Sequence, residues 1–344
     1  METKIVKIDN TTEYSAQLKE AAGIILNDGL VVFPTETVYG LGGNALLSGA
    51  AKKIYSAKGR PSDNPLIIHV ANPEDADKYA FVSEIYYELA KEFMPGPLTV
   101  IMPKRDCIPY SVTGGLETVA VRCPSHPIAH ALIRECGVPI AAPSANISGR
   151  PSPTNSKYVI EDMEGRVDMI LDGGEWDIGL ESTLVSIDGD SLTLLRPGAI
   201  TFDALCCVCR NVKIAPAVLE KLSENEKPLS PGMKYRHYAP NADFVLLDGS
   251  DSDVLDFMIK EQNENGSAVL CYNEELSSLN PSLSIAIGEK HDLEAQAKML
   301  FTSLREADKL GASKIYAHLP TLDGLGLALY NRMIRAAAHT IKKI

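Results

Sequence analysis

Short apolar runs alternate with amphipathic segments along the first half of the chain, and this alternation restricts the possible fold more than any other feature. A helical pattern over residues 13–27 places Leu18, Ala22 and Ile25 on one face, and the buried-strand run LVVF (30–33) follows it. The same reasoning predicts further helices at 48–57, 73–93 and 126–137, and strands at 4–8, 66–70, 98–102, 118–122, 138–142, 167–171, 182–187 and 191–195. This order of elements predicts an α/β domain with a mixed, twisted open sheet and helices packed on it.

The length of 344 residues exceeds what one hydrophobic core usually serves, so we expect two domains. Residues 211–241 are rich in proline, lysine, glutamate and serine and are predicted to be a linker. It would join a first domain, residues 1–210, to a second domain, residues 242–344. In the second domain the strand-like runs DFVLLDG, SAVLCY and SKIYAHL alternate with helical segments at 250–262, 291–310 and 325–342. This predicts a smaller α/β unit with a largely parallel sheet.

The composition limits the possible partners. The net charge of −12 repels a nucleic-acid backbone but leaves room for a local cationic pocket, so a free nucleotide is the favoured phosphate ligand. Seven scattered cysteines, an odd number, indicate reduced thiols, and Cys206, Cys207 and Cys209 lack a second pair at zinc spacing. No signal-peptide pattern and no membrane-spanning apolar run occurs, so we expect a soluble cytoplasmic protein with no membrane partner and no metal site of its own.

One weak dinucleotide motif is present. No P-loop pattern occurs, but GLGGNA (40–45) matches G-x-G-x-x-A after the strand LVVF. Six residues, PTETVY, separate the strand from the first glycine, so the tight strand-to-helix turn of a Rossmann site is missing. The glycines therefore indicate a turn or a close backbone approach, and a nicotinamide oxidoreductase remains an alternative.

Polar groups gather where predicted strands end. PTETVYG follows LVVF, Arg122 ends TVAVR, and PSAN (143–146) follows VPIAA. Ligands of open α/β sheets bind beyond the carboxyl ends of strands. If these strands are neighbours, the three clusters predict one shared cleft.

The loop KGRPSDNP (58–65) carries an unusual pair of cations. Lys58 and Arg60 flank a glycine, and both Arg60 and Asn64 precede a proline, which favours an extended backbone. An extended chain points residues two apart to the same side, so this loop predicts a site for a polyphosphate. The alternative is a pair of solvated cations at the end of a helix. Plain turn chemistry remains the corresponding alternative for Ser144 and Asn146, and a buried strand histidine for His69.

Taken together, these motifs make the sequence similar to the threonylcarbamoyl-AMP synthase family, in its longer two-domain form. The matching segments are PTETVYGLG (34–42), KGRPSDNPL (58–66), TVAVRCP (118–124), APSANISG (142–149), ESTLVS (181–186), RPGAI (196–200) and SPGMKYRHYAP (230–240). The resemblance covers almost the whole first domain and the linker. It implies a YrdC-like first domain and a smaller, Rossmann-like C-terminal accessory domain.

The resemblance also implies a reaction. L-threonine, bicarbonate and ATP would give L-threonylcarbamoyl-AMP and pyrophosphate, with Mg²⁺ held mainly by the phosphates. A separate threonylcarbamoyl transferase would then modify an adenosine next to the anticodon of certain tRNAs. Phosphoryl-type transfer of this kind needs positioning and charge neutralisation more than a covalent nucleophile.

By resemblance, residues of this chain divide into two substrate sites. Lys58 and Arg60 would serve catalysis. The ATP site would comprise Lys58, Arg60, Asn64, Thr118, Ala142, Ser144, Asn146, Ser152, Arg196, Ser230, Tyr235 and Arg236. The threonine site would comprise Thr35, His69, Arg122 and Ser182. The linker residues among them imply a segment that closes over the nucleotide and excludes water.

A different class of function is a non-catalytic RNA-binding module. The net charge of −12 argues against it, and the sequence leaves open whether tRNA is bound directly.

Overall fold

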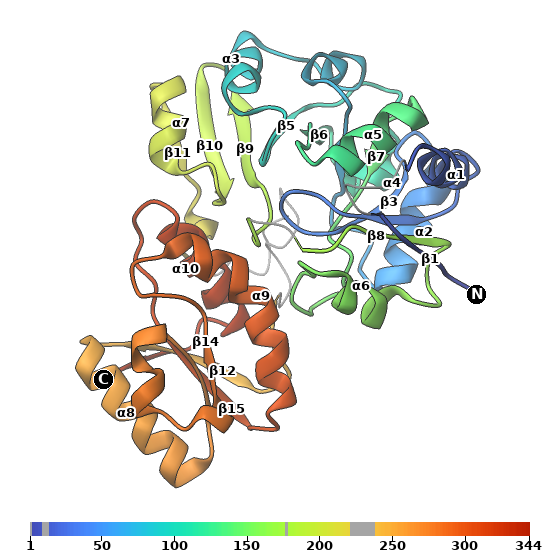
Figure 1. Cartoon of the computed structure of the whole chain (residues 1–344). Coiled ribbons are helices and arrows are strands. Elements are labelled where there is room, and N and C mark those ends of the chain that lie inside the picture. Colours follow the sequence, from blue (N-terminus) through green and yellow to red (C-terminus); the bar gives the residue numbers. More distant parts are fainter. Residues whose placement is uncertain (1, 9–13, 176–177, 221–237) are drawn as a thin grey trace. The chain divides into compact units, whose positions relative to one another are not determined.

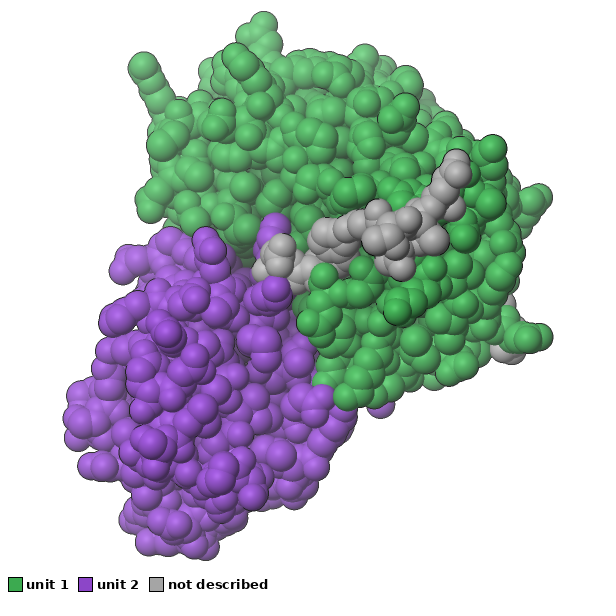
Figure 2. Space-filling view, in the orientation of Figure 1, with its two compact units in different colours: residues 1–148, 153–177, 181–234 green, residues 149–152, 178–180, 235–344 purple. Residues whose placement is uncertain are grey.

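The computed structural model describes residues 2–8, 14–175, 178–220 and 238–344, which form two compact units. Figure 2 colours them separately: unit 1 (green) contains residues 1–148, 153–177 and 181–234, and unit 2 (purple) contains residues 149–152, 178–180 and 235–344. The domain boundaries predicted from the sequence stay predictions. Strand β11 (Val212–Ile214) continues the sheet of unit 1 into the range assigned to the linker.

Unit 1 is built on one mixed sheet of eleven strands (Figure 1). In spatial order the strands are β1 (Lys4–Lys7), β8 (Met169–Asp172), β2 (Val31–Phe33), β3 (Gly40–Asn44), β7 (Ile140–Ala141), β4 (Ile67–His69), β6 (Thr118–Arg122), β5 (Leu98–Pro103), β9 (Thr183–Asp188), β10 (Ser191–Arg196) and β11. Parallel and antiparallel pairs are both present, for example β4 with β6 and β5 with β6. The predicted mixed α/β fold of the first domain is confirmed.

Helices cover both faces of this sheet (Figure 1). They are α1 (Ser15–Leu26), α2 (Ser48–Lys58), α3 (Glu84–Phe93), α4 (Tyr110–Thr113), α5 (Pro127–Cys136), α6 (Ser156–Met163) and α7 (Phe202–Val208), with 3-10 turns η1 (Pro73–Lys78) and η2 (Pro216–Val218). Helices α1 and α5 share a buried cluster with the sheet residues Phe33, Ile140 and Leu171, because each presents an apolar stripe to it. Within the described part of the chain, no helix is both long and apolar enough to cross a bilayer.

The motif GLGGNA lies mainly in strand β3, which pairs antiparallel with β2. A Cβ atom on Gly42 would lie 2.7 Å from Cε1 of Phe33 and 2.8 Å from Cγ2 of Ile140. The neighbouring Gly43 faces the opposite side, where Ala50 and Ile54 of α2 approach it. The expectation of close approach is confirmed. The Rossmann alternative is wrong, because these glycines form a strand and not a turn into a helix.

Unit 2 contains a five-stranded sheet in the order β14 (Ser284–Ala286), β13 (Ala268–Cys271), β15 (Lys314–His318), β12 (Asp243–Asp248) and β16 (Ile341–Lys343). Every pair is parallel, as the sequence predicts. Its other elements are α8 (Asp251–Asn265), α9 (Leu293–Lys309), α10 (Gly326–Ala336), η3 (Asn273–Ser278) and η4 (Pro281–Leu283). Met258, Val269 and Tyr316 belong to a separate buried cluster, so unit 2 has a core of its own.

The predicted helix at 325–342 is wrong at its carboxyl end. Helix α10 ends at Ala336, and residues 341–343 form β16. The reason lies in the backbone between them, where Ala338 (φ 48°) and His339 (φ 64°) adopt left-handed conformations that a helix cannot contain.

Candidate active site

Neighbouring strands of unit 1 place four of the predicted site residues on one face of the sheet. His69 lies opposite Arg122 in the parallel β4–β6 pair, and Arg122 lies opposite Thr99 in the antiparallel β5–β6 pair. Residues directly opposite each other project from the same face. Because side chains alternate along a strand, Thr118 shares this face with Arg122, and Ala142 shares it through the β4–β7 pairing. Strand register therefore assembles residues that lie far apart in the sequence.

The strand directions correct one expectation. Strand β4 is parallel to β6 but antiparallel to β7, so Arg122 and Ser144 lie toward opposite ends of the strands. The prediction that all three polar clusters meet beyond carboxyl ends is therefore wrong. The loop between β2 and β3 ends near Ser144, because Gly40 pairs with that residue, yet its Glu36 contacts Arg122. The loop must fold back over the face of the sheet.

Lys58 joins two of the predicted phosphate-site residues. It is the last residue of α2, which ends at Gly59 in the left-handed conformation (φ 61°). Its Nζ donates to the carbonyl oxygens of Ser144 and Asn146, the latter at 2.7 Å, and Ser144 Oγ donates to Asn146 Oδ1 at 2.5 Å. Lys58 is only 2% exposed, so the alternative of a solvated helix-end cation is wrong.

Arg60 is also buried, at 8% exposure. Its Nη2 donates to the carbonyl oxygens of Asn64 at 3.3 Å and Pro65 at 3.1 Å. Tyr55 donates to the same Asn64 carbonyl at 3.0 Å, and Asn64 is 2% exposed. The two cations of this loop thus lie inside unit 1, where water screens their charge less than it would at the surface.

Arg196 and Ser182, predicted for different substrates, are in direct contact. Arg196 donates from Nε to the carbonyl oxygen of Ser182 and from Nη2 to its Oγ, both at 3.0 Å. Ser182 Oγ lies 2.7 Å from Oγ1 of Thr99, the residue opposite Arg122 in the sheet. Polar contacts therefore join the predicted nucleotide residue Arg196 to the predicted amino-acid residue Ser182 and to Thr99.

Arg122 forms an ion pair that sequence reasoning missed. Its Nη2 lies 2.8 Å from Oε1 of Glu36, and the two side chains are 5% and 12% exposed. Burial, the largest single effect, would raise the pKa of Glu36. The charge of Arg122 and hydrogen bonding by Arg122 and by the backbone of Glu36 and Ser125 together outweigh it, so the pKa lies below its usual value. The available signal was that Glu36 is the one carboxylate in PTETVYG.

Two histidines near this pair are neutral. Burial, reinforced by the charge of Arg122, lowers the pKa of His69 to about 3. Burial likewise lowers the pKa of His126 to about 4. The ring of His69 meets Phe33 edge-on with centroids 6.3 Å apart, while Nδ1 of His126 accepts from the backbone of Ile128 at the start of α5. His126 is a second residue that the sequence reasoning did not select.

The remaining predicted residues differ in what the structure says of them. Thr35 is buried and uses its hydroxyl within its own loop, donating to the Val38 carbonyl at 2.6 Å. Ser152 is buried and belongs to segment 149–152, which is part of unit 2. Ser230, Tyr235 and Arg236 lie outside the described residues.

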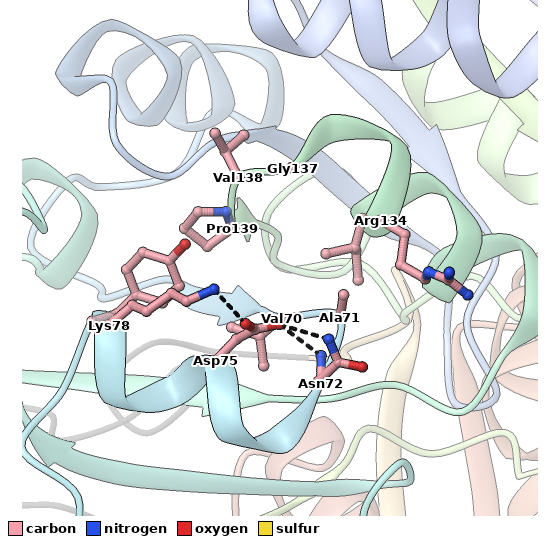
Figure 3. A pocket seen from close by; sticks show the side chains of 11 residues that line it. Val70, Ala71, Asn72, Asp75, Lys78, Arg134, Gly137, Val138 and Pro139 are labelled. Atoms are coloured by element: carbon pink, nitrogen blue, oxygen red, sulfur yellow. Dashed lines mark hydrogen bonds and ion pairs between the residues drawn. The ribbon is translucent and has the colours of Figure 1, made fainter.

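A separate cavity in unit 1 is not this site. It has a volume of about 260 Å³ and lies between η1 with the residues before it and the end of α5 (Figure 3). Asp75 accepts from the backbone and the side chain of Asn72, both at 3.0 Å, and pairs with Lys78 at 2.7 Å, while Arg134 points away. Its acidic group is thus already satisfied, and no predicted site residue lines it.

Comparison with known proteins identifies the class of each part. The family model described as "Telomere recombination" (Sua5/YciO/YrdC) matches residues 23–198, and the model described as "Threonylcarbamoyl-AMP synthase, C-terminal domain" matches residues 200–338. The first part is therefore a YrdC-type domain. With both models matched in order, the chain belongs to the two-domain Sua5 family.

Relatives match over the whole length. The threonylcarbamoyl-AMP synthase of Bacillus subtilis is 44% identical over 348 residues, covering 99% of this chain and 99% of the relative. That of Pyrococcus abyssi is 44% identical over 332 residues, covering 95% and 96%.

Solved structures agree. P. abyssi Sua5 complexed with L-threonine has a TM-score of 0.90 at 42% identity and covers 99% of this chain and 100% of that one. Escherichia coli YciO, at 23% identity and a TM-score of 0.52 over 57% of this chain, shows the fold of the first part alone.

Proposed function

We propose that this protein is a threonylcarbamoyl-AMP synthase, which converts L-threonine, bicarbonate and ATP to L-threonylcarbamoyl-AMP and pyrophosphate. The observation that carries the proposal is that relatives of this name match nearly the full chain at 44% identity. The burial of the cations Lys58, Arg60 and Arg196 in unit 1 supports it.

The chemistry matches the groups that are present. The amine of threonine combines with bicarbonate, losing water, to give a carbamate. A carbamate oxygen then attacks the α-phosphorus of ATP, and pyrophosphate leaves. The negative charge that builds up needs fixed cations in a site with little water, and Lys58, Arg60 and Arg196 are all at most 8% exposed.

We assign the two substrates to adjacent sites. The phosphates would be bound by Lys58, Arg60 and Arg196, with the neutral groups Asn64, Thr118, Ala142, Ser144, Asn146 and Ser152 around the nucleotide. Threonine would lie against Thr35, His69, Arg122 and Ser182. The contact between Arg196 and Ser182 supports adjacent sites.

The linker residues Ser230, Tyr235 and Arg236 would close over the nucleotide. Such closure would keep water from the labile carbamate and adenylate.

Among the described residues, no three His, Cys, Asp or Glu side chains lie close enough to hold a metal ion. We therefore propose that Mg²⁺ enters with ATP on phosphate oxygens. The adenylate would then pass to a transferase that acts on tRNA.

Pyrophosphate release tests the proposal. Purified protein with Mg–ATP should release pyrophosphate only when L-threonine and bicarbonate are both present, and mass spectrometry should detect threonylcarbamoyl-AMP. Release that continues without threonine would contradict the proposal.

A pair of lysine variants tests the assigned phosphate site. Lys58→Met removes a buried cation and should reduce kcat/KM for ATP by about a hundred-fold, since each charged contact in such a site contributes several kcal/mol. Lys52→Met, on the exposed side of the same helix, is the matched control and should leave activity unchanged. Activity is compared per folded molecule, because Lys58 also holds the backbone of residues 144 and 146.

A further inference from the structure

One edge of the Arg122 guanidinium is only partly used. Its Nε and Nη2 atoms are buried and make no hydrogen bond in good geometry, although Nη2 lies 2.8 Å from a Glu36 oxygen. These two atoms form the side of the guanidinium that can hold a carboxylate with two parallel hydrogen bonds. An arginine used only to stabilise the fold would have these donors satisfied, because buried polar groups without partners are costly.

The carboxylate of Glu36, like the Arg122 guanidinium, has buried polar atoms with incomplete hydrogen bonding. Both of its oxygens are buried without a hydrogen bond in strict geometry, and the charge of Arg122 together with the backbone of Glu36 and Ser125 favours the ionised form. A buried anion in this state can accept hydrogen bonds from a cation that enters beside it. Its lowered pKa makes it a poor proton acceptor, so binding and not general-base catalysis is the role that fits.

A third unsatisfied atom completes the pattern. Nδ1 of His69 is buried and has no hydrogen-bond partner among the described residues, and His69 lies directly opposite Arg122 in the sheet. Neutral imidazole can exchange a hydrogen bond with a hydroxyl without bringing a charge. The pocket therefore offers a cationic fork, an anionic acceptor and a neutral partner together.

We propose that Glu36 and Arg122 together form a two-part binding site for the zwitterion of the amino-acid substrate. Arg122 binds the α-carboxylate, Glu36 binds the α-ammonium group, and each neutralises the other when the substrate is absent. The inference rests on the proposed function, because it takes threonine as the amino acid, and it adds Glu36 as the residue that recognises the amine.

This arrangement makes the amine a condition for binding. A carboxylate ligand without an amine is repelled by the negative charge of Glu36 beside Arg122, and it offers Glu36 no hydrogen-bond donor. A zwitterion supplies a new partner to each member of the pair, so both buried charges stay neutralised. The pocket should therefore reject hydroxy acids that lack an α-amino group, even when their carboxylate and hydroxyl match those of threonine.

Calorimetric titration of the full chain without nucleotide tests this, with L-threonine and with 3-hydroxybutyrate, which is threonine without its amino group. Wild-type protein should bind threonine and bind 3-hydroxybutyrate at least about ten-fold more weakly. Glu36→Gln should bind threonine about ten-fold or more weakly than wild type, yet bind 3-hydroxybutyrate at least as tightly as wild type does. Glu88→Gln, an exposed glutamate on α3, should change neither affinity.

The opposite response of the two ligands is the decisive result. If Glu36→Gln lowers the affinity for both ligands equally, or for neither, the proposal is wrong. Glu36→Asp keeps the charge but shortens the side chain, and it should fall between wild type and Glu36→Gln for threonine; it serves if Glu36→Gln fails to fold. Wild-type protein that neither binds threonine nor uses it would refute the proposed function instead, so the two failures are separate.

Discussion

At the scale of single residues, burial decides what the polar groups of unit 1 can do. Lys58 and His69 are 2% and 3% exposed; carbonyl oxygens accept hydrogen bonds from Lys58, whereas burial keeps His69 neutral. The same desolvation that strengthens a fixed cation toward a phosphate expels the proton from an imidazole. The interior of unit 1 thus contains both cationic and neutral polar side chains.

The neutrality of His69 predicts how stability depends on pH. Its pKa falls from 6.5 to about 3 in the folded protein, so below pH 6.5 the unfolded chain binds a proton that the folded one does not. Stability is therefore lost as the pH falls through this range, by about 1.4 kcal/mol per pH unit for one histidine. His69→Asn should make the dependence shallower by about that amount between about pH 6 and pH 5, above the range of ordinary carboxyl groups.

Urea unfolding at a series of pH values measures this slope. His130→Asn, a half-buried histidine on α5, is the control and should leave the slope closer to that of the wild type. Equal slopes for wild type and His69→Asn would contradict a neutral His69.

At the scale of elements, the sequence predicts those with a strong pattern. The amphipathic helix α5 and the apolar strand β5 appear where periodicity indicates them. Strand β3 could not be predicted, because three of its five residues are glycine, which disfavours strands in isolation. Its place depends on Phe33 and Ile140 filling the space above Gly42.

Some contacts of the candidate site could also be predicted from sequence motifs, and others could not. Lys58, Ser144 and Asn146 come together as their motifs indicate. The ion pair of Glu36 with Arg122 could not be predicted from the sequence, because it depends on strand direction and on a loop that folds back over the sheet.

A pair of glycine substitutions tests the account of β3. Gly42→Ala puts a methyl group within 2.8 Å of Phe33 and Ile140, so we expect it to lower the free energy of unfolding by about 1–3 kcal/mol. Gly23→Ala in α1 meets no atom within 4 Å and should raise it by up to about 1 kcal/mol, since alanine favours a helix. Chemical denaturation of both variants should give opposite signs; a harmless Gly42→Ala would show that the packing is looser than described.

At the scale of the whole molecule, charge separates the catalytic function from an RNA-binding one. The chain carries −12 overall, and the buried cations of unit 1 lie at most 8% exposed, out of reach of a polyanionic backbone. We therefore expect no tight binding of tRNA by this protein alone. Filter binding across a range of salt concentrations measures it, and a dissociation constant near or below about 1 μM with a steep salt dependence would contradict the expectation.

The hydroxyl of Ser182 lies between Arg196 and Thr99, so in the proposed assignment it joins the two substrate sites. A ligand that draws Arg196 toward a phosphate changes the hydrogen bonds left for the amino acid, and the reverse holds equally. Thermodynamic linkage then requires that nucleotide alter the affinity for amino acid by the same factor as amino acid alters the affinity for nucleotide. Substitution of this one hydroxyl should therefore reduce the coupling free energy between the two substrates more than it reduces either affinity taken alone.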